Sequence, residues 1–180
     1  QRIIQPVPRE DLEAVLPFLV PTHAAMLRVQ AWIGMRPGEM VQMRVEDIEQ
    51  ENPDLWIYRP VHHKTERHGH KREIVLGPQC ILCLRRFIQR HQTGYLFQPE
   101  DAYSELKERR GKERKSKPTP SQRQRKQANA NNPRRKFGEF IQVTNFSQAV
   151  RRACVEAGVP RFTPNQVRHL VATEVREIYG

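Results

Sequence analysis

Almost all of the net positive charge of this chain lies in one stretch, residues 104–136, which cannot join a hydrophobic core. The stretch contains 13 lysines and arginines and 3 acidic residues, a net charge of 13 − 3 = +10 out of +11 for the 180-residue chain. It has no aromatic residue, and Leu106 is its single leucine. Such a segment buries too little apolar surface to offset the entropy lost on ordering. The core must therefore come from the sequence on either side, and we expect the segment to be mobile or only loosely helical.

The two flanking parts predict a mainly helical α+β domain. Apolar residues recur at helical spacing in most of the flanks, whereas Trp56 and Tyr58 alternate with Leu55 and Ile57 as in a strand. The predicted helices span residues 9–19, 22–33, 37–43, 79–90, 144–157 and 164–179, and the predicted strands span residues 45–48, 55–61 and 72–76. The apolar helix faces, including Trp32, are assigned to the core. We expect helices around a small three-stranded antiparallel sheet.

Length and composition fit one domain, residues 1–180, with the basic insertion at about 98–140. The longest apolar stretch, around Ala14 to Val20, is interrupted by Pro17 and is too short to span a bilayer. The three cysteines are an odd and sparse set, unlike the disulfide framework of a secreted protein. These features predict a soluble cytoplasmic protein with no membrane association.

Three residues in the flanks suit an anion. Arg36 follows a glycine-containing turn between two predicted helices, and Arg168 and His169 stand side by side near the start of the last helix. Guanidinium groups stay charged and can bind two phosphate oxygens at once. Two of them around one phosphate would stabilise the extra negative charge of a pentacoordinate transition state. Composition alone carries this interpretation only weakly, because an arginine at a helix edge is more often a solvated surface group.

The order of several motifs strengthens the interpretation of these residues as a phosphate site. From Glu10 almost to its end, the chain resembles the catalytic domain of the tyrosine recombinases, the phage integrase family. Gly34-Met35-Arg36-Pro37-Gly38-Glu39-Met40 is similar to the family's Gly-x-Arg-x-x-Glu box, and Val45-Glu46-Asp47-Ile48 resembles the strand after it. Lys64-Thr65 lies on the hairpin where the family keeps its lysine, and Glu73-Ile74-Val75-Leu76 resembles the returning strand. Thr163-Pro164-Asn165-Gln166-Val167-Arg168-His169, followed by Ala172-Thr173, resembles the second box, which normally reads His-x-x-Arg-His.

The resemblance implies site-specific DNA recombination or integration by transesterification, without metal, ATP or cofactor, through a 3′-phosphotyrosine intermediate. Arg36 and Arg168 would hold the non-bridging phosphate oxygens, His169 would donate a further hydrogen bond, and Lys64 would protonate the leaving oxygen. Glu39 either orients Arg36 or is a surface carboxylate. The implied partner is double-stranded DNA at the nucleoid, bound by a homo-oligomer, a tetramer by family resemblance.

The predicted DNA contacts are Arg36, Lys64, Arg168 and the basic segment from Lys107 to Lys136. We expect the segment to strengthen binding through phosphates rather than bases. The alternative for this segment is a solvated surface helix with no partner, which the spacing of glutamates and lysines between Glu105 and Lys117 favours.

Two features depart from the family pattern. Asn165 stands where the family usually has histidine, and a carboxamide cannot take a proton, so general-base help is not expected from it. The family's tyrosine is expected beyond Gly180, which predicts that the 180-residue chain alone is inactive. Tyr179 is the only tyrosine after the second box, but it is expected to pack together with Val175 and Ile178.

Other interpretations stay open. A degenerate recombinase relative that binds DNA without cutting it is the main alternative and is favoured by Asn165, and a type IB topoisomerase is a third. A zinc site is a further alternative, because Cys80 and Cys83 lie near a histidine-rich hairpin in the sequence. Cysteines in an apolar helical stripe are, however, usually core residues. A two-metal nuclease needs clustered carboxylates, and those of this chain are scattered.

Overall fold

A computed structural model describes residues 5–62, 71–131 and 136–180 of the chain. Its helices are α1 (Arg9–Val15), α2 (Pro21–Ile33), α3 (Pro37–Val41), α4 (Pro78–Arg90), α5 (Pro99–Lys112), α6 (Pro120–Asn131), α7 (Val143–Ala157) and α8 (Pro164–Tyr179). The strands are β1 (Ile48–Asn52), β2 (Leu55–Tyr58) and β3 (Ile74–Leu76), and two short 3-10 turns, η1 and η2, span Leu16–Phe18 and Val45–Asp47. The predicted mainly helical α+β architecture is confirmed.

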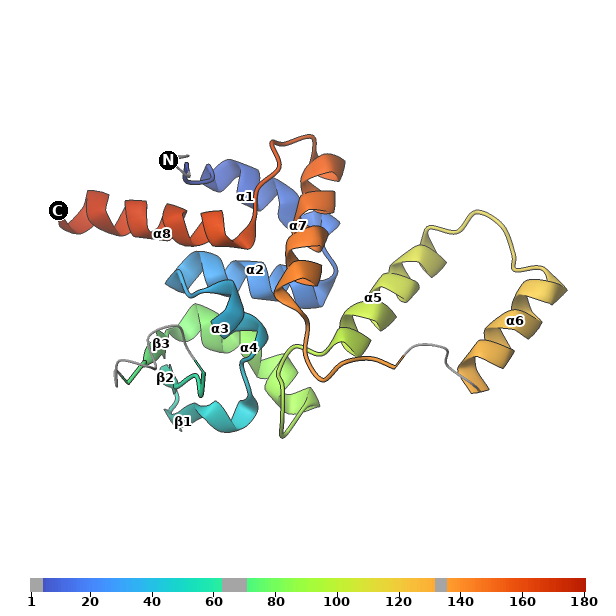
Figure 1. The fold of residues 1–180 in the computed structure, drawn as a ribbon, viewed down its shortest axis with the longest axis horizontal. Helices are drawn as coiled ribbons and strands as arrows, with labels where there is room; N and C mark the ends of the chain where they lie inside the picture. Colours follow the sequence, from blue (N-terminus) through green and yellow to red (C-terminus); the bar gives the residue numbers. More distant parts are fainter. Residues whose placement is uncertain (1–4, 63–70, 132–135) are drawn as a thin grey trace.

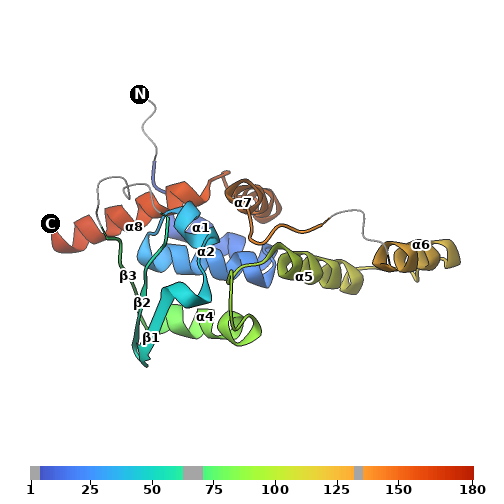
Figure 2. The same cartoon turned by 60° about the horizontal axis from the view of Figure 1, so that its bottom comes forward.

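Helix α2 lies at the centre of the fold. It packs against α3, α4, α5, α7, α8 and β3, with α7 and α8 on one side and α4 and the sheet on the other (Figures 1 and 2). Met26, Leu27 and Val29 are fully buried, so α2 is covered nearly all round, as expected for a core helix. Trp32, at its end, is 37% exposed, so its assignment to the core was wrong.

The three strands form an antiparallel sheet in the order β1-β2-β3. Trp56 pairs with Leu76 and Tyr58 with Ile74, and all four side chains are buried, whereas Val75 is exposed. Successive side chains of a strand point to opposite faces, so the buried set marks the face that packs on the helices. The predicted alternation of Trp56 and Tyr58 with their neighbours is therefore confirmed.

The strand predicted at residues 45–48 was wrong, because Val45–Asp47 is a 3-10 turn and β1 begins only at Ile48. The reason is a tertiary contact that overrides the local pattern. The backbone N–H of Val45 donates to the carbonyl of Gly94, and the Glu46 carboxylate accepts from the Gly94 N–H at 2.8 Å. These bonds hold the turn against the loop that follows α4.

The basic segment, which we expected to be mobile or only loosely helical, is helical over much of its described length. Its first helix, α5, starts in the folded body, where Ala102 is buried and Leu106 packs against the core. Glu105 accepts a hydrogen bond from the backbone N–H of Thr22 at 2.8 Å, and Arg109 donates to the carbonyl of Phe18 at 2.7 Å. Sequence reasoning missed this anchor because polar contacts to η1 and the first turn of α2 supplement the few apolar contacts of Ala102 and Leu106.

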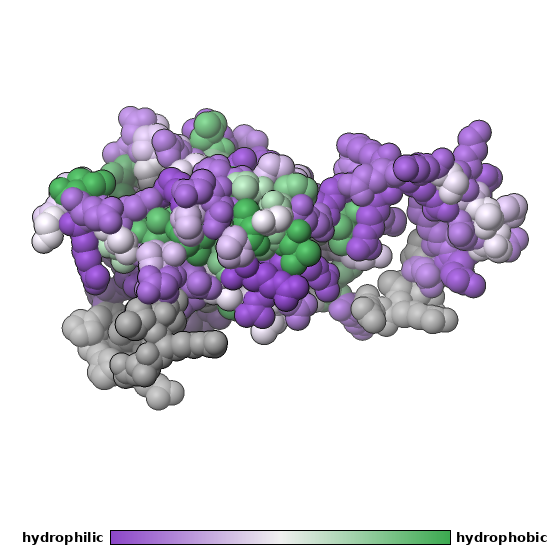
Figure 3. Space-filling view, turned by 90° about the horizontal axis from the view of Figure 1, so that it is seen from above, coloured by the Kyte–Doolittle hydropathy of each residue, from purple (hydrophilic) through white to green (hydrophobic). Residues whose placement is uncertain are grey.

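Beyond the anchored part, the end of α5 and all of α6 extend away from the body (Figures 1 and 2), and we call this region, residues 107–131, the basic arm. Its surface is hydrophilic on the face seen in Figure 3. Within the described residues, no helix has both the length and the apolar character required to cross a bilayer.

Helix α8 is covered by the core only in its first half. Val167 and Leu170 are buried, and the Arg9 guanidinium binds both carboxylate oxygens of Glu174 at 2.7 and 2.6 Å. After Glu174 the helix extends past α1 and α2 (Figure 1). Ile178 is 71% and Tyr179 83% exposed, so the expected packing of these two residues was wrong.

Candidate active site

The turn between α2 and α3 presents Arg36. Gly34 ends α2 in the left-handed conformation, with φ of 63°, which glycine adopts without strain. A Cβ atom at this position would lie 3.0 Å from a methyl group of Val171 on α8. The buried Gln30 donates to the carbonyl of Met35 at 3.1 Å and fixes the next residue of the turn. Arg36 therefore starts α3 from a backbone held on both sides.

Glu39, in the first turn of α3, lies at the centre of a group of arginines. Its side chain is 3% exposed. One carboxylate oxygen accepts from Arg36 Nη1 at 2.9 Å and the other from the Arg36 backbone N–H at 2.9 Å. Tyr58 of β2 donates to the backbone carbonyl of Glu39 at 2.9 Å, which ties α3 to the sheet. Glu39 thus orients Arg36, and the alternative of a surface carboxylate is wrong.

Burial alone would raise the pKa of Glu39, but the hydrogen bonds that it accepts outweigh burial. The bonds from the backbone N–H of Arg36, from the side chain of Arg72 and from that of Arg36 leave the pKa below its ordinary value of 4.5. The carboxylate is therefore ionised at neutral pH although it is buried.

Arg168 reaches the same turn from α8. Its Nη1 donates to the carbonyl of Gly34 at 2.9 Å, although the two residues are 134 positions apart in the chain. Burial lowers the pKa of Arg168, and repulsion from Arg36 and Arg72 lowers it further, while Glu39 acts in the opposite direction. The positive charge of Arg168 thus lies beside two like charges, an arrangement that is common at functional sites.

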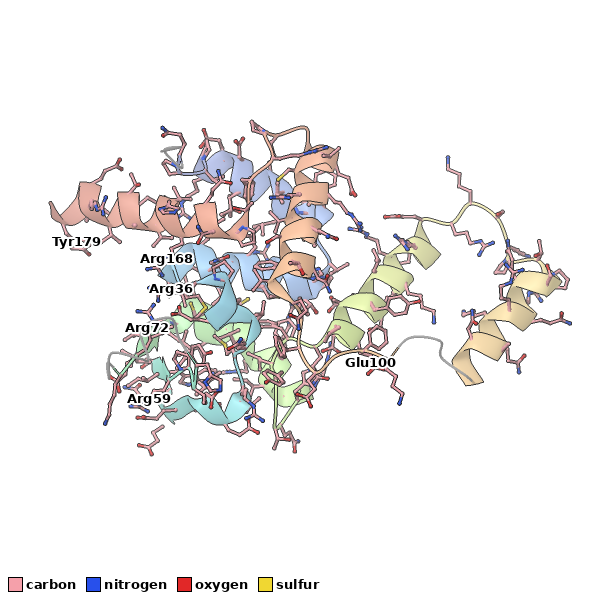
Figure 4. The ribbon with its side chains drawn as sticks, viewed as in Figure 1. Arg36, Arg59, Arg72, Glu100, Arg168 and Tyr179 are labelled. Atoms are coloured by element: carbon pink, nitrogen blue, oxygen red, sulfur yellow. The ribbon has the colours of Figure 1, made fainter. Side chains whose placement is uncertain are left out.

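Arg72, two residues before β3, completes the group and was missed by the sequence analysis. Its Nε and Nη2 donate to the two oxygens of Glu39 at 2.9 and 3.3 Å. Arg36, Arg72 and Arg168 lie close together where α3, α8 and the sheet meet (Figure 4). With three arginines and one glutamate, the group carries a net charge of 3 − 1 = +2.

The other predicted site residues have different places. His169 is half-buried on α8, and among the described residues its ring makes no hydrogen bond or ion pair. Asn165 is exposed in the first turn of α8, three and four residues before Arg168 and His169, a spacing that puts side chains on one helix face. Lys64 lies outside the described residues.

The arrangement suits the binding of an oxyanion. Two of its arginines are 30% exposed at their side chains, so they are open to a ligand while Glu39 beneath them is buried. Guanidinium groups bind phosphate oxygens in pairs, and in a partly buried site such contacts are stronger than in water. The group can therefore hold one phosphodiester and stabilise added negative charge on it.

The cysteines belong to the core. Burial raises the pKa of the Cys80 thiol to about 12, and the Cys83 thiol faces the carbonyl of Ala25. His91 pairs instead with Asp101 at the start of α5. In residues 5–62, 71–131 and 136–180, no three side chains gather in a way that could hold a metal ion.

A second positively charged feature lies on the basic arm. A cleft of about 570 Å³ between α5 and α6 is lined by six lysines and arginines and no acidic residue. These are Lys107, Arg110, Arg114, Lys115, Lys117 and Lys126. The arginine group lies in the folded body, well away from the arm (Figure 4).

Comparison with known proteins identifies relatives of the whole chain. Residues 9–177 match the phage integrase family. The crystal structure of XerH site-specific recombinase bound to difH substrate, a pre-cleavage complex, is similar with a TM-score of 0.62 and 14% identity, over 99% of this chain and 45% of that chain. The crystal structure of XerA recombinase is similar with a TM-score of 0.60 and 15% identity, over 100% of this chain and 52% of that chain. The chain thus spans about half the length of these structures. No curated protein sequence matches it.

Proposed function

Because the chain belongs to the phage integrase family, we propose that the protein carries out site-specific DNA recombination or integration by transesterification through a 3′-phosphotyrosine intermediate. Its fold is that of the tyrosine recombinases. The observation that carries the proposal is the meeting of Arg36 and Arg168 at one turn, through the bond from Arg168 to the carbonyl of Gly34. Two segments far apart in the chain thereby supply the guanidinium groups that one phosphate requires.

In the proposed reaction, Arg36 and Arg168 bind the two non-bridging oxygens of the scissile phosphate. Attack by a tyrosine hydroxyl adds negative charge to these oxygens. The net positive charge of the arginine group stabilises this added charge. His169 donates a further hydrogen bond, and Lys64 protonates the leaving 5′ oxygen. The tyrosine hydroxyl loses its proton to solvent, and its oxygen becomes bonded to the 3′ phosphate as the bond from phosphorus to the 5′ oxygen breaks. The phosphodiester bond energy is thereby kept for rejoining, and no metal or ATP is consumed.

The nucleophile of this reaction lies beyond Gly180 in the proposal. Asn165 occupies the position of the family's histidine and can donate or accept a hydrogen bond but cannot act as a base. That substitution favours a second candidate, a relative that binds DNA at this site without cutting it.

The two functions are separated by covalent trapping. The full-length protein is incubated, in EDTA and without nucleotide, with a duplex carrying its target site and a nick that lets the released strand diffuse away. A protein–DNA adduct that survives denaturation is expected of the recombinase. Specific retention of the duplex with no adduct at any pH supports the non-catalytic binder.

We further propose that residues 1–180 form one catalytic domain on which the basic arm is a DNA-binding insertion. Every charged residue that lines its cleft is a lysine or an arginine, and no carboxylate in the lining competes with phosphates. Because Glu105 anchors α5 to the first turn of α2 and Arg109 anchors it to η1, the arm has a fixed base from which to follow a duplex away from the scissile phosphate.

Changing the six lining cations to glutamine should make DNA binding less dependent on salt. Each phosphate contact contributes about −0.9 to the slope of log affinity against log salt, so the slope should flatten by up to about 5. Glutamine keeps the helices because its helix propensity is close to that of lysine and arginine. Fluorescence anisotropy with a labelled duplex between low and physiological salt measures the slope.

The control changes two exposed arginines of α4, Arg85 and Arg90, to glutamine. This variant loses charge outside the arm and should keep the slope of the native chain. An arm variant with a native slope would mean that α5 and α6 are a solvated surface feature with no DNA contact.

A further inference from the structure

We propose that Arg72 is a positioning residue of the arginine group, one that holds Glu39 so that Arg36 stays available to the phosphate. The consequence for catalysis rests on the proposed function, whereas the hold on Glu39 does not. Arg72 lies two residues before β3 and outside both sequence boxes, whereas Arg36 directly precedes α3 and Arg168 lies on α8.

The two arginines that flank Glu39 make different hydrogen bonds to it. Arg72 uses Nε and Nη2 to bind both carboxylate oxygens side-on. In the described part of the chain, the Arg36 side chain gives Glu39 a single bond, from Nη1. The Nε and Nη2 groups of Arg36 are therefore left to donate to a phosphate, which a two-oxygen contact between Arg36 and Glu39 would prevent.

Charge leads to the same conclusion. A single arginine beside a buried glutamate forms a neutral pair, which offers little to an incoming anion. With Arg72 as a second partner, Arg36, Glu39 and Arg72 together carry 2 − 1 = +1, and Arg168 adds a further charge. A carboxylate exposed by only 3% is costly to keep ionised, and hydrogen bonds from a second arginine help to offset that cost.

The strand register explains how Arg72 reaches this position. Ile74 and Leu76 of β3 face the core, and a residue two before Ile74 continues the same face of the strand. Tyr58, the partner of Ile74, donates to the backbone of Glu39. Arg72, just ahead of β3, binds the side chain of Glu39, and Tyr58 of β2 binds its backbone, so together they fix α3 on the sheet.

The first test is a ¹³C NMR titration of the Glu39 carboxyl group in the 180-residue chain, in its native form and in Arg72→Ala and Arg72→Lys. Removal of Arg72 deletes two of the hydrogen bonds to the Glu39 carboxylate, while the bond from Tyr58 to the Glu39 backbone stays in place. The pKa of Glu39 should rise, corresponding to at least about tenfold tighter proton binding in Arg72→Ala. In Arg72→Lys the pKa of Glu39 should be intermediate, because an ammonium group keeps the charge but cannot span both oxygens. If the alanine variant does not fold, the lysine variant alone provides the test.

The matched control is Arg59→Ala. Arg59 of the same sheet also binds two carboxylates, those of Glu49 and Glu73, but it lies outside the arginine group (Figure 4). Its removal should leave the Glu39 titration unchanged. An unchanged Glu39 titration in both Arg72 variants would overturn the proposal.

The second test measures the cleavage rate of the full-length protein at saturating nicked duplex. Arg72→Ala should lower the rate by about 100-fold through misplacement of Arg36, with partial recovery in Arg72→Lys and no change in Arg59→Ala. A full rate, or weaker DNA binding with an unchanged rate at saturation, would contradict a positioning role. If the native full-length protein itself forms no adduct, the proposed function fails, and the titration still decides whether Arg72 holds Glu39.

Discussion

Replacing Arg168 or Arg36 by alanine in the full-length protein should lower the rate of DNA cleavage by at least about 10²- to 10³-fold, the effect of removing one preorganised donor to a developing oxyanion. The fold should survive both changes. Removal of Arg168 loses its hydrogen bond to the Gly34 carbonyl but also relieves repulsion from Arg36 and Arg72, so the melting temperature should change little. Arg36→Ala leaves Glu39 with both of its bonds from Arg72. Adduct formation on a nicked duplex and thermal unfolding are measured on the same preparations.

The matched control is Arg90→Ala, which removes one positive charge from the end of α4, where the side chain pairs with Asp101. It should cleave at the native rate when DNA is saturating. If Arg168→Ala loses activity only in proportion to a loss of folded protein, the arginine has a structural role. If it retains the native rate, the two arginines do not share one phosphate and the recombinase proposal fails.

The parts of the site that could be predicted from the sequence are those whose residues lie together in short contiguous motifs. Gly34 and Pro37 mark the end of one helix and the start of the next, so the turn that presents Arg36 follows from local rules. The capping position of Thr163 likewise fixes the start of α8, where the Gln166 side chain accepts from the Thr163 backbone N–H. Arg168 could therefore be assigned to the first turns of a helix from the sequence alone.

Arg72 was missed because no motif contains it, yet the sequence does hold a signal for it. Residues 72–76 were predicted to be a strand, and alternation places Arg72 on the same face as Ile74 and Leu76. An arginine on a core-facing position requires a buried anion, since an unpaired charge is too costly there. The identity of that anion, Glu39, depends on how the sheet docks on α3 and could not be read from spacing.

Neither the anchor of the basic segment nor the exposure of the end of α8 could be read from composition or spacing. Composition reports how much apolar surface a segment can bury, but not whether a few polar contacts to another element can anchor it. Glu105 and Arg109 tie α5 to the body through the backbone of Thr22 and Phe18. Conversely, helical spacing places Ile178 and Tyr179 on an apolar stripe, although the body of the described structure does not extend far enough to cover that stripe.

The 180-residue chain should form no covalent adduct with DNA, and Tyr179 should not be the nucleophile of the full-length protein. Helix α8 is continuous from Pro164 to Tyr179, so the 179 − 168 = 11 residues after Arg168 place Tyr179 about 16 Å along the helix axis. An attacking oxygen must approach the phosphorus to within about 3.5 Å. Tyr179 is also 83% exposed and lies at the far end of α8 from Arg168 (Figure 4), so no described element directs its hydroxyl to the arginine group.

The role of Tyr179 is tested by measuring adduct formation on one nicked duplex with four proteins. These are the 180-residue chain, the full-length protein, and each of these with Tyr179→Phe. An adduct is expected from both full-length forms and from neither 180-residue form, because the substitution removes a hydroxyl that is too distant to react. Retention of the duplex by the 180-residue chain at low salt shows that a missing adduct reflects chemistry rather than lost binding, since the arginine group and the basic arm are both present in it. An adduct of the 180-residue chain that disappears with Tyr179→Phe would refute the assignment, and it would require the end of α8 to unwind and fold back to the arginine group.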